Sequence, residues 1–329
     1  MRESLRRSAR DSVINLDKTP SLTSYDAVDE IKRLLDTRKV GHAGSLDPFA
    51  TGVLLICTGR ATKVTRFLME LEKEYTGTIR LGSETDTDDS TGEVTSETRD
   101  FEVSSDELSR AAASFAGSIM QRPPKVSALK RNGRRFYEMA RSGESFEPEA
   151  RSVTIHEFLV RAFRAPDVEF SLRCSRGTYV RSIARDLGRL LGCGGHLREL
   201  RRTRVGQFVV EDSVTLDDLK EALGPRGGAE GLATASSSGG RISGLWPLDE
   251  ALGFLPGCVL REEAVGSVLD GRSPGLDDFE MMDERSAQGG CVRVMSRDGR
   301  LIAIGMAPGP GAEPVVKLER VLARKGEPE

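Results

Sequence analysis

The sequence predicts an α+β protein with one large domain followed by a smaller, β-rich one. Near the start, the apolar segments 13–17 and 53–57 predict strands, and a segment with helical periodicity lies between them. In the middle, segments 153–163 and 168–174 predict two neighbouring strands. After residue 245 the pattern changes to short strands separated by turn residues. The large domain therefore mixes helices and strands, whereas the end of the chain consists mainly of strands.

The composition is that of a soluble globular protein. Of the 329 residues, 38% are hydrophobic and 30% are charged, which allows a sizeable core. No stretch approaches the roughly 18 to 20 apolar residues that span a bilayer, and the start of the chain lacks the apolar block of a secretory signal. We expect a cytoplasmic protein without membrane contact, and nothing in the sequence indicates a protein partner or a state other than a monomer.

Metal, disulfide and cofactor chemistry is not indicated. The five cysteines are widely scattered and never form a C-x-x-C pair, and the chain has only three histidines. Neither G-x-G-x-x-G after a strand nor G-x-x-x-x-G-K-[ST] occurs. We therefore expect no metal and no cofactor, so that any chemistry would use carboxylate, tyrosine and arginine side chains.

Charge is unevenly distributed along the chain. The formal net charge of −3 by itself argues mildly against a nucleic-acid partner. Acidic residues concentrate in segments 84–107 and 249–284, whereas segments 122–135 and 173–204 are strongly basic. Because the local field matters more than the total, the basic segments are candidates for contact with phosphate, with a solvated surface as the alternative.

The first third of the chain is predicted to alternate strands and helices. Residues 1–11 are rich in Arg and Ser, and we expect them to be disordered. After the strand at 13–17, Thr23 and Asp26 form a capping box that opens a helix. The apolar spacing in 60–71 predicts a second amphipathic helix.

The following segments predict a strand, an acidic loop and a helix. The alternation in 74–81 places four residues on one face of a strand: Tyr75, Gly77, Ile79 and Leu81. Gly77 is expected to leave open space beside the Tyr75 ring. Segment 84–100 is acidic and rich in turn residues, so we expect a solvated loop with no core to bury. A helix with its own capping box follows at 104–115.

A pair of strands leads into a basic helix. Segment 168–174 alternates apolar residues inward and is expected to pair with 153–163. Thr178 is placed to cap a helix that carries three arginines at four-residue spacing: Arg181, Arg185 and Arg189. Nine arginines lie between 173 and 204, against two acidic residues. We therefore expect this stripe to contact an RNA backbone.

A segment of small residues separates the two predicted domains, 12–223 and 245–329. Residues 224–244 consist largely of Gly, Ala and Ser and predict a flexible linker. In the second domain, strands at 291–295 and 301–305 flank an Asp-Gly turn and predict a hairpin.

The loop from Gly41 to Gly52 is the strongest candidate for a functional site. It contains one carboxylate, Asp47, and one imidazole, His42, and the apolar run behind it is expected to hold it rigidly. From spacing alone, an Asx turn in which Asp47 only precedes Pro48 is an equally good interpretation.

This loop and two later segments resemble the motifs of the tRNA pseudouridine synthase B (TruB) family. Gly44-Ser45-Leu46-Asp47-Pro48, with His42 before it and Ala-Thr-Gly-Val-Leu after it, resembles the family's catalytic motif. Segments 174–181 and 192–203 resemble its second and third signatures. The run Arg122–Tyr137 carries the Pro-Pro-x-x-Ser-Ala-x-Lys pattern of the stand-alone bacterial members, which argues against the RNA-guided branch.

The resemblance implies that Asp47 is the catalytic carboxylate and that Arg181 lies beside it. Asp47 could attack the substrate as a nucleophile or remove the C2′ proton of the ribose, and the sequence leaves both possibilities open. We expect the guanidinium of Arg181 to lower the pKa of Asp47, so that the carboxylate stays ionised well below neutral pH.

The resemblance also implies four residues that contact the substrate. Tyr75 would pack against the target base, Tyr179 would line the uracil pocket, and Leu200 would touch the base. His42 would occupy the space that the base vacates or contact a phosphate. For Tyr75 and Leu200 the alternative is a core position, and for His42 it is a locally hydrogen-bonded side chain.

The resemblance further implies the fold and the reaction. Residues 12–223 would form a pseudouridine synthase domain on a mixed, mainly antiparallel central sheet with flanking helices, and residues 245–329 a PUA-like RNA-binding module. The activity would be that of a tRNA pseudouridine(55) synthase, an isomerase acting on the T-arm stem-loop of tRNA. It would flip the T-loop uridine out, cleave its glycosidic bond and reattach the base through C5.

Two other functions compete with this one. A non-catalytic RNA-binding or tRNA-folding protein would keep the same surface without the reaction. A glycosidase-like hydrolase would need paired carboxylates, and the motif around Asp47 offers no second acid.

Overall fold

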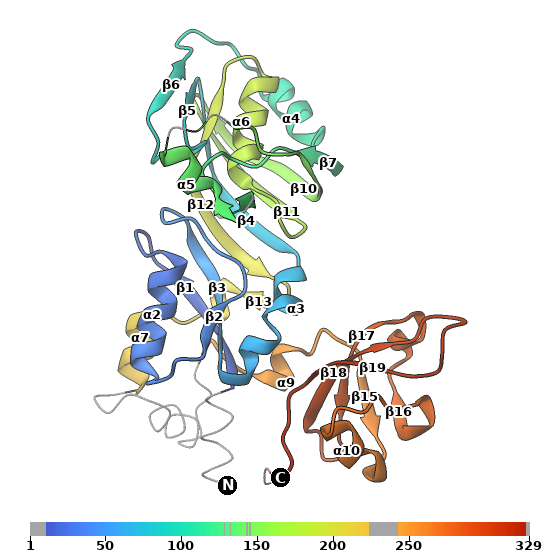
Figure 1. Cartoon of the computed structure of the whole chain (residues 1–329). Coiled ribbons are helices and arrows are strands. Elements are labelled where there is room, and N and C mark those ends of the chain that lie inside the picture. The colour runs from blue at the N-terminus through green and yellow to red at the C-terminus, as the bar shows by residue number, and fades with distance from the viewer. Residues whose placement is uncertain are drawn as a thin grey trace.

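The computed structural model describes residues 11–127, 129–131, 133–142, 144, 146–223 and 243–326. The predicted disordered start lies outside these residues except for Asp11, as does the predicted linker except for 243–244. Figure 1 shows an elongated domain built on a long sheet, with a smaller domain beside its lower end. The predicted α+β class is confirmed.

The large domain is built on a ten-stranded sheet whose main path runs β14-β1-β3-β12-β4-β11-β10-β7, with β2 paired to β3 and β13 to β12. Strands β3 and β12 pair in parallel and the other neighbours are antiparallel, which confirms a mixed, mainly antiparallel sheet. The ten strands are β1 (Ser12–Lys18), β2 (Val40–His42), β3 (Thr51–Thr58), β4 (Lys73–Leu81), β7 (Gly117–Gln121), β10 (Arg151–Arg164), β11 (Asp167–Cys174), β12 (Gly195–Val205), β13 (Phe208–Val209) and β14 (Leu245–Pro247).

Helices cover this sheet, and two of them begin as the sequence predicts. Both expected capping boxes are present, with Thr23 before α2 and Ser104 before α4. The α-helices of the large domain and the segment that leads from it are α2 (Ser24–Leu34), α3 (Thr65–Glu70), α4 (Ser105–Ala113), α5 (Phe136–Arg141), α6 (Val180–Leu190), α7 (Leu216–Leu223) and α9 (Leu248–Ala251). Two small hairpins complete the domain: β5 (Ser83–Thr85) with β6 (Val94–Glu97), and β8 (Lys130–Arg131) with β9 (Arg134–Arg135).

Strand β3 is buried on both faces, which explains its unbroken apolar sequence. Leu54 and Ile56 pack into the cluster that α2 and α6 help to form. Val53, Leu55 and Cys57 pack on the other face, against the segments that contain Phe208 and Trp246. A strand covered on both sides has no polar face, so the run lacks the alternation of a half-exposed strand. It forms a rigid support directly behind the Asp47 loop.

The predicted helix over 60–71 is wrong in one respect, because the structure divides it. Residues Gly59–Lys63 form a 3₁₀-helix, and α3 begins only at Thr65. The hydroxyls of Thr62 and Thr65 donate to backbone carbonyls three residues earlier, at 2.7 and 3.0 Å. Such side-chain bonds compete with helical bonds, and β-branched residues propagate a helix poorly.

The expectation of a solvated loop with no core at 84–100 is wrong for its first part, whereas the residues of β6 are exposed as expected. The ends of the loop form the β5–β6 hairpin, and Thr85 and Asp89 are buried. Ser90 N donates to Leu197 O at 2.9 Å, so that the loop is fastened to β12. The composition indicated solvent, but arginines on α6 supply partners for the acidic side chains.

The smaller domain has its own five-stranded sheet, in the order β16-β15-β17-β18-β19. The predicted hairpin of two strands around an Asp-Gly turn is confirmed as β17 and β18. The elements are β15 (Gly257–Leu260), α10 (Glu262–Leu269), β16 (Phe279–Met282), β17 (Gly290–Met295), β18 (Leu301–Ala307) and β19 (Lys317–Val321). The likeness to a PUA module and the domain boundaries stay predictions, but residues 245–247 pair with β1 and so extend the large sheet.

An apolar cluster joins the two domains. Val64 and Phe67, around the start of α3, pack with Leu252, Ile304 and Leu322. Among the described residues, every helix is too short or too polar to span a bilayer.

Candidate active site

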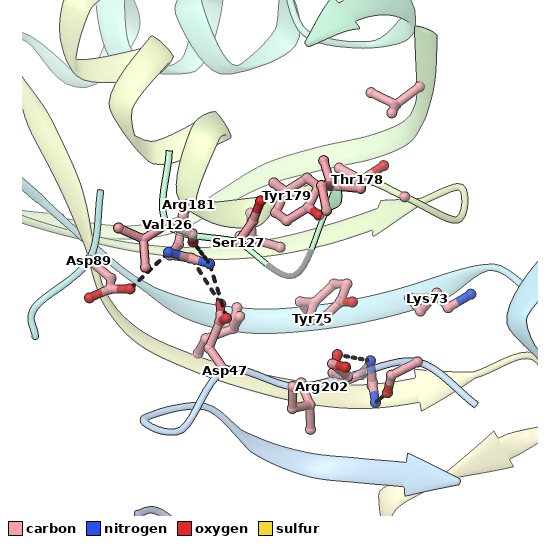
Figure 2. Close-up of a pocket in the computed structure, with 18 of the residues that line it drawn as sticks. Asp47, Lys73, Tyr75, Asp89, Val126, Ser127, Thr178, Tyr179, Arg181 and Arg202 are labelled. Carbon is pink, nitrogen blue, oxygen red and sulfur yellow. Dashed lines mark hydrogen bonds and ion pairs between the residues drawn. The ribbon is translucent and has the colours of Figure 1, made fainter. Parts of the chain in front are cut away.

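A cavity of about 1140 Å³ opens over β4 and β12, between the Asp47 loop and the start of α6. Five of the six predicted site residues line it: Asp47, Tyr75, Tyr179, Arg181 and Leu200. Figure 2 shows how far apart in the sequence they originate, since Tyr75 projects from β4 while Arg181 and Tyr179 come from the start of α6. The sheet therefore brings the three motifs that resemble TruB signatures together at this cavity.

The loop that carries Asp47 is fastened from several sides. Lys18, fully buried at the end of β1, donates from Nζ to the carbonyls of Thr19, Leu22 and Pro48 at 2.7 to 3.1 Å. The Ser24 hydroxyl lies 2.9 Å from the amide nitrogen of Leu46 and 3.1 Å from its carbonyl oxygen. The Asp47 loop is therefore tied to the end of β1 and to α2. The alternative of an Asx turn that stands by itself does not describe it.

Arg202, which sequence analysis passed over, holds the other half of the loop. Its guanidinium is buried and donates to the carbonyls of Val53 at 2.6 Å, Ser45 at 3.3 Å and Gly44 at 3.1 Å. Gly52 pairs with Arg202 across the parallel β3–β12 contact, and a Cβ there would lie only 2.1 Å from the Arg202 oxygen. With φ of +96°, the position requires glycine for two reasons.

Asp47 and Arg181 form a two-pronged ion pair. Nη2 of Arg181 donates to Oδ1 of Asp47 at 3.0 Å, and its Nε lies 2.9 Å from Oδ2. The Arg181 side chain is 6% exposed, whereas that of Asp47 is 34% exposed and faces the cavity. The Nη2 contact is a hydrogen bond, whereas the Nε contact adds charge attraction without hydrogen-bonding geometry, so the carboxylate is held at both oxygens.

Asp89 is a third member of this network that sequence analysis missed. Its side chain is 5% exposed, and Oδ2 lies 3.3 Å from Nη1 of Arg181. Oδ1 accepts hydrogen bonds from the hydroxyls of Thr87 and Thr91. The Asp-Thr-rich sequence of this loop was a usable signal, because threonines beside an acid often bind it locally. Arg181 thus joins two carboxylates from different parts of the chain.

The environment raises the pKa of Asp47, contrary to the predicted lowering. Burial at the cavity floor is the largest influence and disfavours the charged form. Arg181 opposes it, as expected, but Asp89 adds a second upward influence. The error was to consider the guanidinium without the desolvation that accompanies a buried ion pair.

The predicted RNA-facing arginine stripe on α6 is also wrong. Arg181 and Arg185 are buried, and Arg185 pairs with Asp88 at 2.8 Å and with its neighbour Asp186. Arg189 forms a forked pair with Glu84. The stripe fastens the acidic loop to α6. Arg181 and Arg185 are buried and must be paired within the protein, whereas Arg189 is 58% exposed and pairs with Glu84 at the surface.

Tyr75 and Leu200 form part of the cavity wall, and one prediction about their surroundings is wrong. Each of the two residues is 8% exposed. Gly77 does not leave space beside Tyr75, since a Cβ there would meet Glu199 O at 2.3 Å and the ring of Phe170 at 3.1 Å. The glycine is required for strand contact and ring packing instead.

Thr178 does not cap α6. Its hydroxyl donates to Ser175 O at 3.0 Å, and Tyr179 is the residue at the cap position. The buried Gln121 satisfies the Tyr179 backbone, because its Oε1 accepts from the Tyr179 amide at 2.8 Å and its Nε2 donates to the Tyr179 carbonyl at 3.1 Å. A side chain from β7 thereby positions the start of the helix.

His42 is the one predicted site residue outside the cavity wall. It lies on β2, half-buried, and pairs with Ile56 of β3. Burial and the nearby Arg202 lower its pKa, which favours the neutral imidazole. Within the described residues, no group of three or more His, Cys, Asp or Glu side chains is placed to hold a metal ion.

Comparison with known proteins identifies the family. A model of the N-terminal domain of TruB family pseudouridylate synthases matches residues 32–180, and one of the tRNA pseudouridylate synthase B C-terminal domain matches 181–230. A protein of Burkholderia mallei (strain ATCC 23344) named tRNA pseudouridine synthase B is 40% identical over 98% of this chain and 97% of its own length. This chain belongs to the TruB family.

Further TruB relatives and solved structures agree. The tRNA pseudouridine synthase B of Aromatoleum aromaticum is 42% identical over 92% of this chain and 90% of its own. A Cbf5-Nop10-Gar1 complex contains a chain with a TM-score of 0.76 and 27% identity, covering 98% of this chain and 88% of that one. An archaeal box H/ACA sRNP Nop10-Cbf5 complex gives 0.73 and 26%, with 98% and 89% coverage. The TruB resemblance of the motifs and the pseudouridine synthase fold are therefore confirmed.

Proposed function

We propose that this TruB family member is a tRNA pseudouridine synthase that isomerises the T-loop uridine, position 55, of tRNA. The observation that carries the proposal is the Asp47 carboxylate, oriented by Arg181 and open to a cavity that Tyr75 and Tyr179 also line. The names of the relatives support tRNA as the substrate.

The reaction balances without any added reagent. The bond between N1 of the uracil and C1′ of the ribose breaks, the base turns, C5 bonds to C1′, and the C5 proton is lost while N1 gains one. Asp47 has two possible roles, attack by its oxygen or removal of the C2′ proton. Either role requires the ionised carboxylate, so the raised pKa of Asp47 should move the acid limit of activity to a higher pH than an unperturbed carboxyl group would set.

The target base must leave its stack to reach this carboxylate. Extrusion costs on the order of a few kcal/mol, and stacking against Tyr75 or Tyr179 and contact with Leu200 would offset part of it. Contacts with phosphate would supply more, and they make binding depend on salt.

A basic cluster at the junction of the two domains can supply such contacts. Lys63 donates to Val321 O in the smaller domain, and Lys39, Arg320 and Arg324 lie near enough to act on its charge. Burial and these neighbouring cations lower the pKa of Lys63, as expected where positive charges are gathered together. This cluster replaces the α6 stripe as the candidate for backbone binding.

Release of tritium from T-arm RNA labelled at C5 of uridine tests the activity. We expect release by the wild type and its loss in Asp47→Asn, which keeps the side-chain shape but removes the charge. Asp36→Asn is the matched control, because Asp36 is exposed in a turn with φ of +45°, which Asn tolerates well. Equal release by wild type and Asp47→Asn would remove Asp47 from the mechanism.

A second measurement identifies which uridine reacts and distinguishes an enzyme from a non-catalytic RNA-binding protein. Label placed only at position 55 should be released, whereas label at other uridines of the same tRNA should stay. A non-catalytic RNA-binding protein would bind the T-arm with an affinity that Asp47→Asn leaves unchanged, and would release no label from any position. Free uracil as a product would indicate a hydrolase instead.

A further inference from the structure

Ser127 lines the cavity, and its hydroxyl, covered by neighbouring atoms, has no hydrogen-bond partner among the described residues. The residue as a whole is 6% exposed. A buried hydroxyl without a partner costs about 1–3 kcal/mol, so such groups are rare unless a water or ligand completes them.

Three other buried polar side chains of this wall have hydrogen-bond partners, whereas Nε of Arg181, although 2.9 Å from Oδ2 of Asp47, has none within the described part of the chain. The amine of Lys73 donates to the carbonyls of Met69 and Leu71. Arg202 donates to three carbonyls, and Asp89 accepts from two threonines. Their hydrogen bonds hold these three side chains in place, whereas no hydrogen bond from the described residues holds the Ser127 hydroxyl, which can turn toward a base that enters the cavity.

Ser127 is placed next to the reacting groups. The carbonyl of the preceding residue, Val126, accepts from Nη2 of Arg181 at 3.1 Å, and the same nitrogen binds Asp47. Figure 2 shows Ser127 between Arg181 and Tyr179, across the cavity from Tyr75. Burial raises the pKa of the Tyr179 phenol, and the nearby Ser127 side chain acts to lower it. The two hydroxyls are neighbours, but they do not meet in hydrogen-bonding geometry.

We propose that Ser127 is a substrate-binding residue whose hydroxyl hydrogen-bonds the polar edge of the extruded uracil, formed by O2, N3–H and O4. The inference rests on the proposed function, because it concerns the base that Asp47 would act on. A hydroxyl can donate to a carbonyl oxygen or accept from N3–H, so it matches every atom of this edge.

The geometry of the reaction suits this contact. When uracil turns by half a revolution about the line through N3 and C6, N1 exchanges with C5 and O2 exchanges with O4, while N3–H stays in place. The edge opposite C6 therefore shows the same order of acceptor, donor and acceptor before and after the turn. A single rotatable hydroxyl can hold the base in both orientations.

N3–H lies on the axis of the turn, so a bond from it to the hydroxyl can be kept throughout and then contributes equally to bound substrate and transition state. Its loss should therefore raise KM and Kd with little change in kcat. We expect Ser127→Ala to weaken RNA binding roughly 2- to 12-fold, the range for one neutral hydrogen bond. Ser127→Thr keeps the hydroxyl and should restore most of the affinity. Ser118→Ala, at an exposed serine outside the cavity wall, is the control for removal of a hydroxyl.

A double-mutant cycle between protein and RNA tests the contact. T-arm hairpins carry uridine, 2-thiouridine, 4-thiouridine or 3-methyluridine at the target position, and Kd is measured for wild type, Ser127→Ala and Ser127→Thr. If Ser127 binds the edge, at least one altered base weakens binding to wild type and Ser127→Thr but not to Ser127→Ala, because the same bond cannot be lost twice.

Equal sensitivity of wild type and Ser127→Ala to all three altered bases would overturn the proposal. So would a Ser127→Ala variant whose affinity for the uridine hairpin equals that of the wild type. Thermal unfolding of each variant distinguishes lost contact from lost fold. The cycle depends only on binding, so a wild type that binds RNA without releasing tritium would refute the proposed function while the Kd values still decide the role of Ser127.

Discussion

Replacement of Arg181 by Met is the most informative perturbation of this site. The guanidinium is 6% exposed and contacts two carboxylates, Asp47 and Asp89. It also donates to the carbonyls of Thr87 at 2.9 Å and Val126 at 3.1 Å. Met has a similar length and no charge, so the change leaves the buried Asp89 and the partly exposed Asp47 without the cation that they share.

The cost can be worked out from this geometry. Two unit charges about 4 Å apart attract by about 4 kcal/mol at an effective dielectric constant of about 20. Removal of one partner from a buried pair costs about 3–5 kcal/mol, which agrees. We therefore expect Arg181→Met to lower the free energy of unfolding at neutral pH by about 3–5 kcal/mol. Loss of the two contacts that position Asp47 should reduce turnover about 100-fold or more.

The pH dependence supplies an independent check with a defined sign. Burial raises the pKa of Asp47 and Arg181 opposes this, so that the variant should have a still higher pKa. Its activity should therefore be lost at a higher pH on acidification than that of the wild type. A carboxyl whose folded pKa lies above its unfolded value destabilises the fold when charged, so the stability deficit should shrink as the pH falls toward the ordinary carboxyl value of 3.8.

Urea unfolding and tritium release, each followed across pH, measure these effects. Arg181→Lys is the matched control, since it keeps the positive charge but replaces the planar guanidinium by a single amine. Its loss of unfolding free energy should be smaller than that of Arg181→Met. A deficit for Arg181→Met below about 1 kcal/mol, or one that stays constant on acidification, would contradict a charge-based role for Arg181.

Three further changes probe other parts of the site. Asp89→Asn should move the acid limit of activity to lower pH, because Asp89 contributes to the raised pKa of Asp47. Asp88→Asn is its control and should leave that limit in place, because Asp88 pairs with Arg185. Burial lowers the pKa of Lys18 from 10.5 to about 8, so folding favours its neutral amine. The free energy of unfolding of the wild type should therefore rise by about 3 kcal/mol between pH 8 and 10.5, and Lys18→Met should lack this rise. Gly52→Ala should lose at least about 2 kcal/mol in urea unfolding, because its Cβ overlaps a backbone carbonyl at positive φ. Gly41→Ala, with no atom within 4 Å of the added Cβ, should be nearly neutral by the same measurement.

The sequence by itself determined the local features of the fold, such as helix starts and tight hairpins, because these depend only on residues that are neighbours in the chain. The capping boxes at Thr23 and Ser104 and the hairpin of β17 and β18 were predictable because each is complete within a few residues. Five of the six residues predicted from the motifs line one cavity, and they could be named from the sequence because each motif is contiguous in the chain.

Tertiary structure decided where charge and hydrogen bonds are satisfied. The acidic loop and the arginines of α6 were each assigned to solvent or RNA, since no local pattern shows that Asp89 lies 3.3 Å from Arg181. The same holds for Arg202, whose partners on the Asp47 loop are about 150 residues away. The direction of the Asp47 pKa also needed the fold, because burial is a property of everything packed around a group and not of its neighbours in sequence.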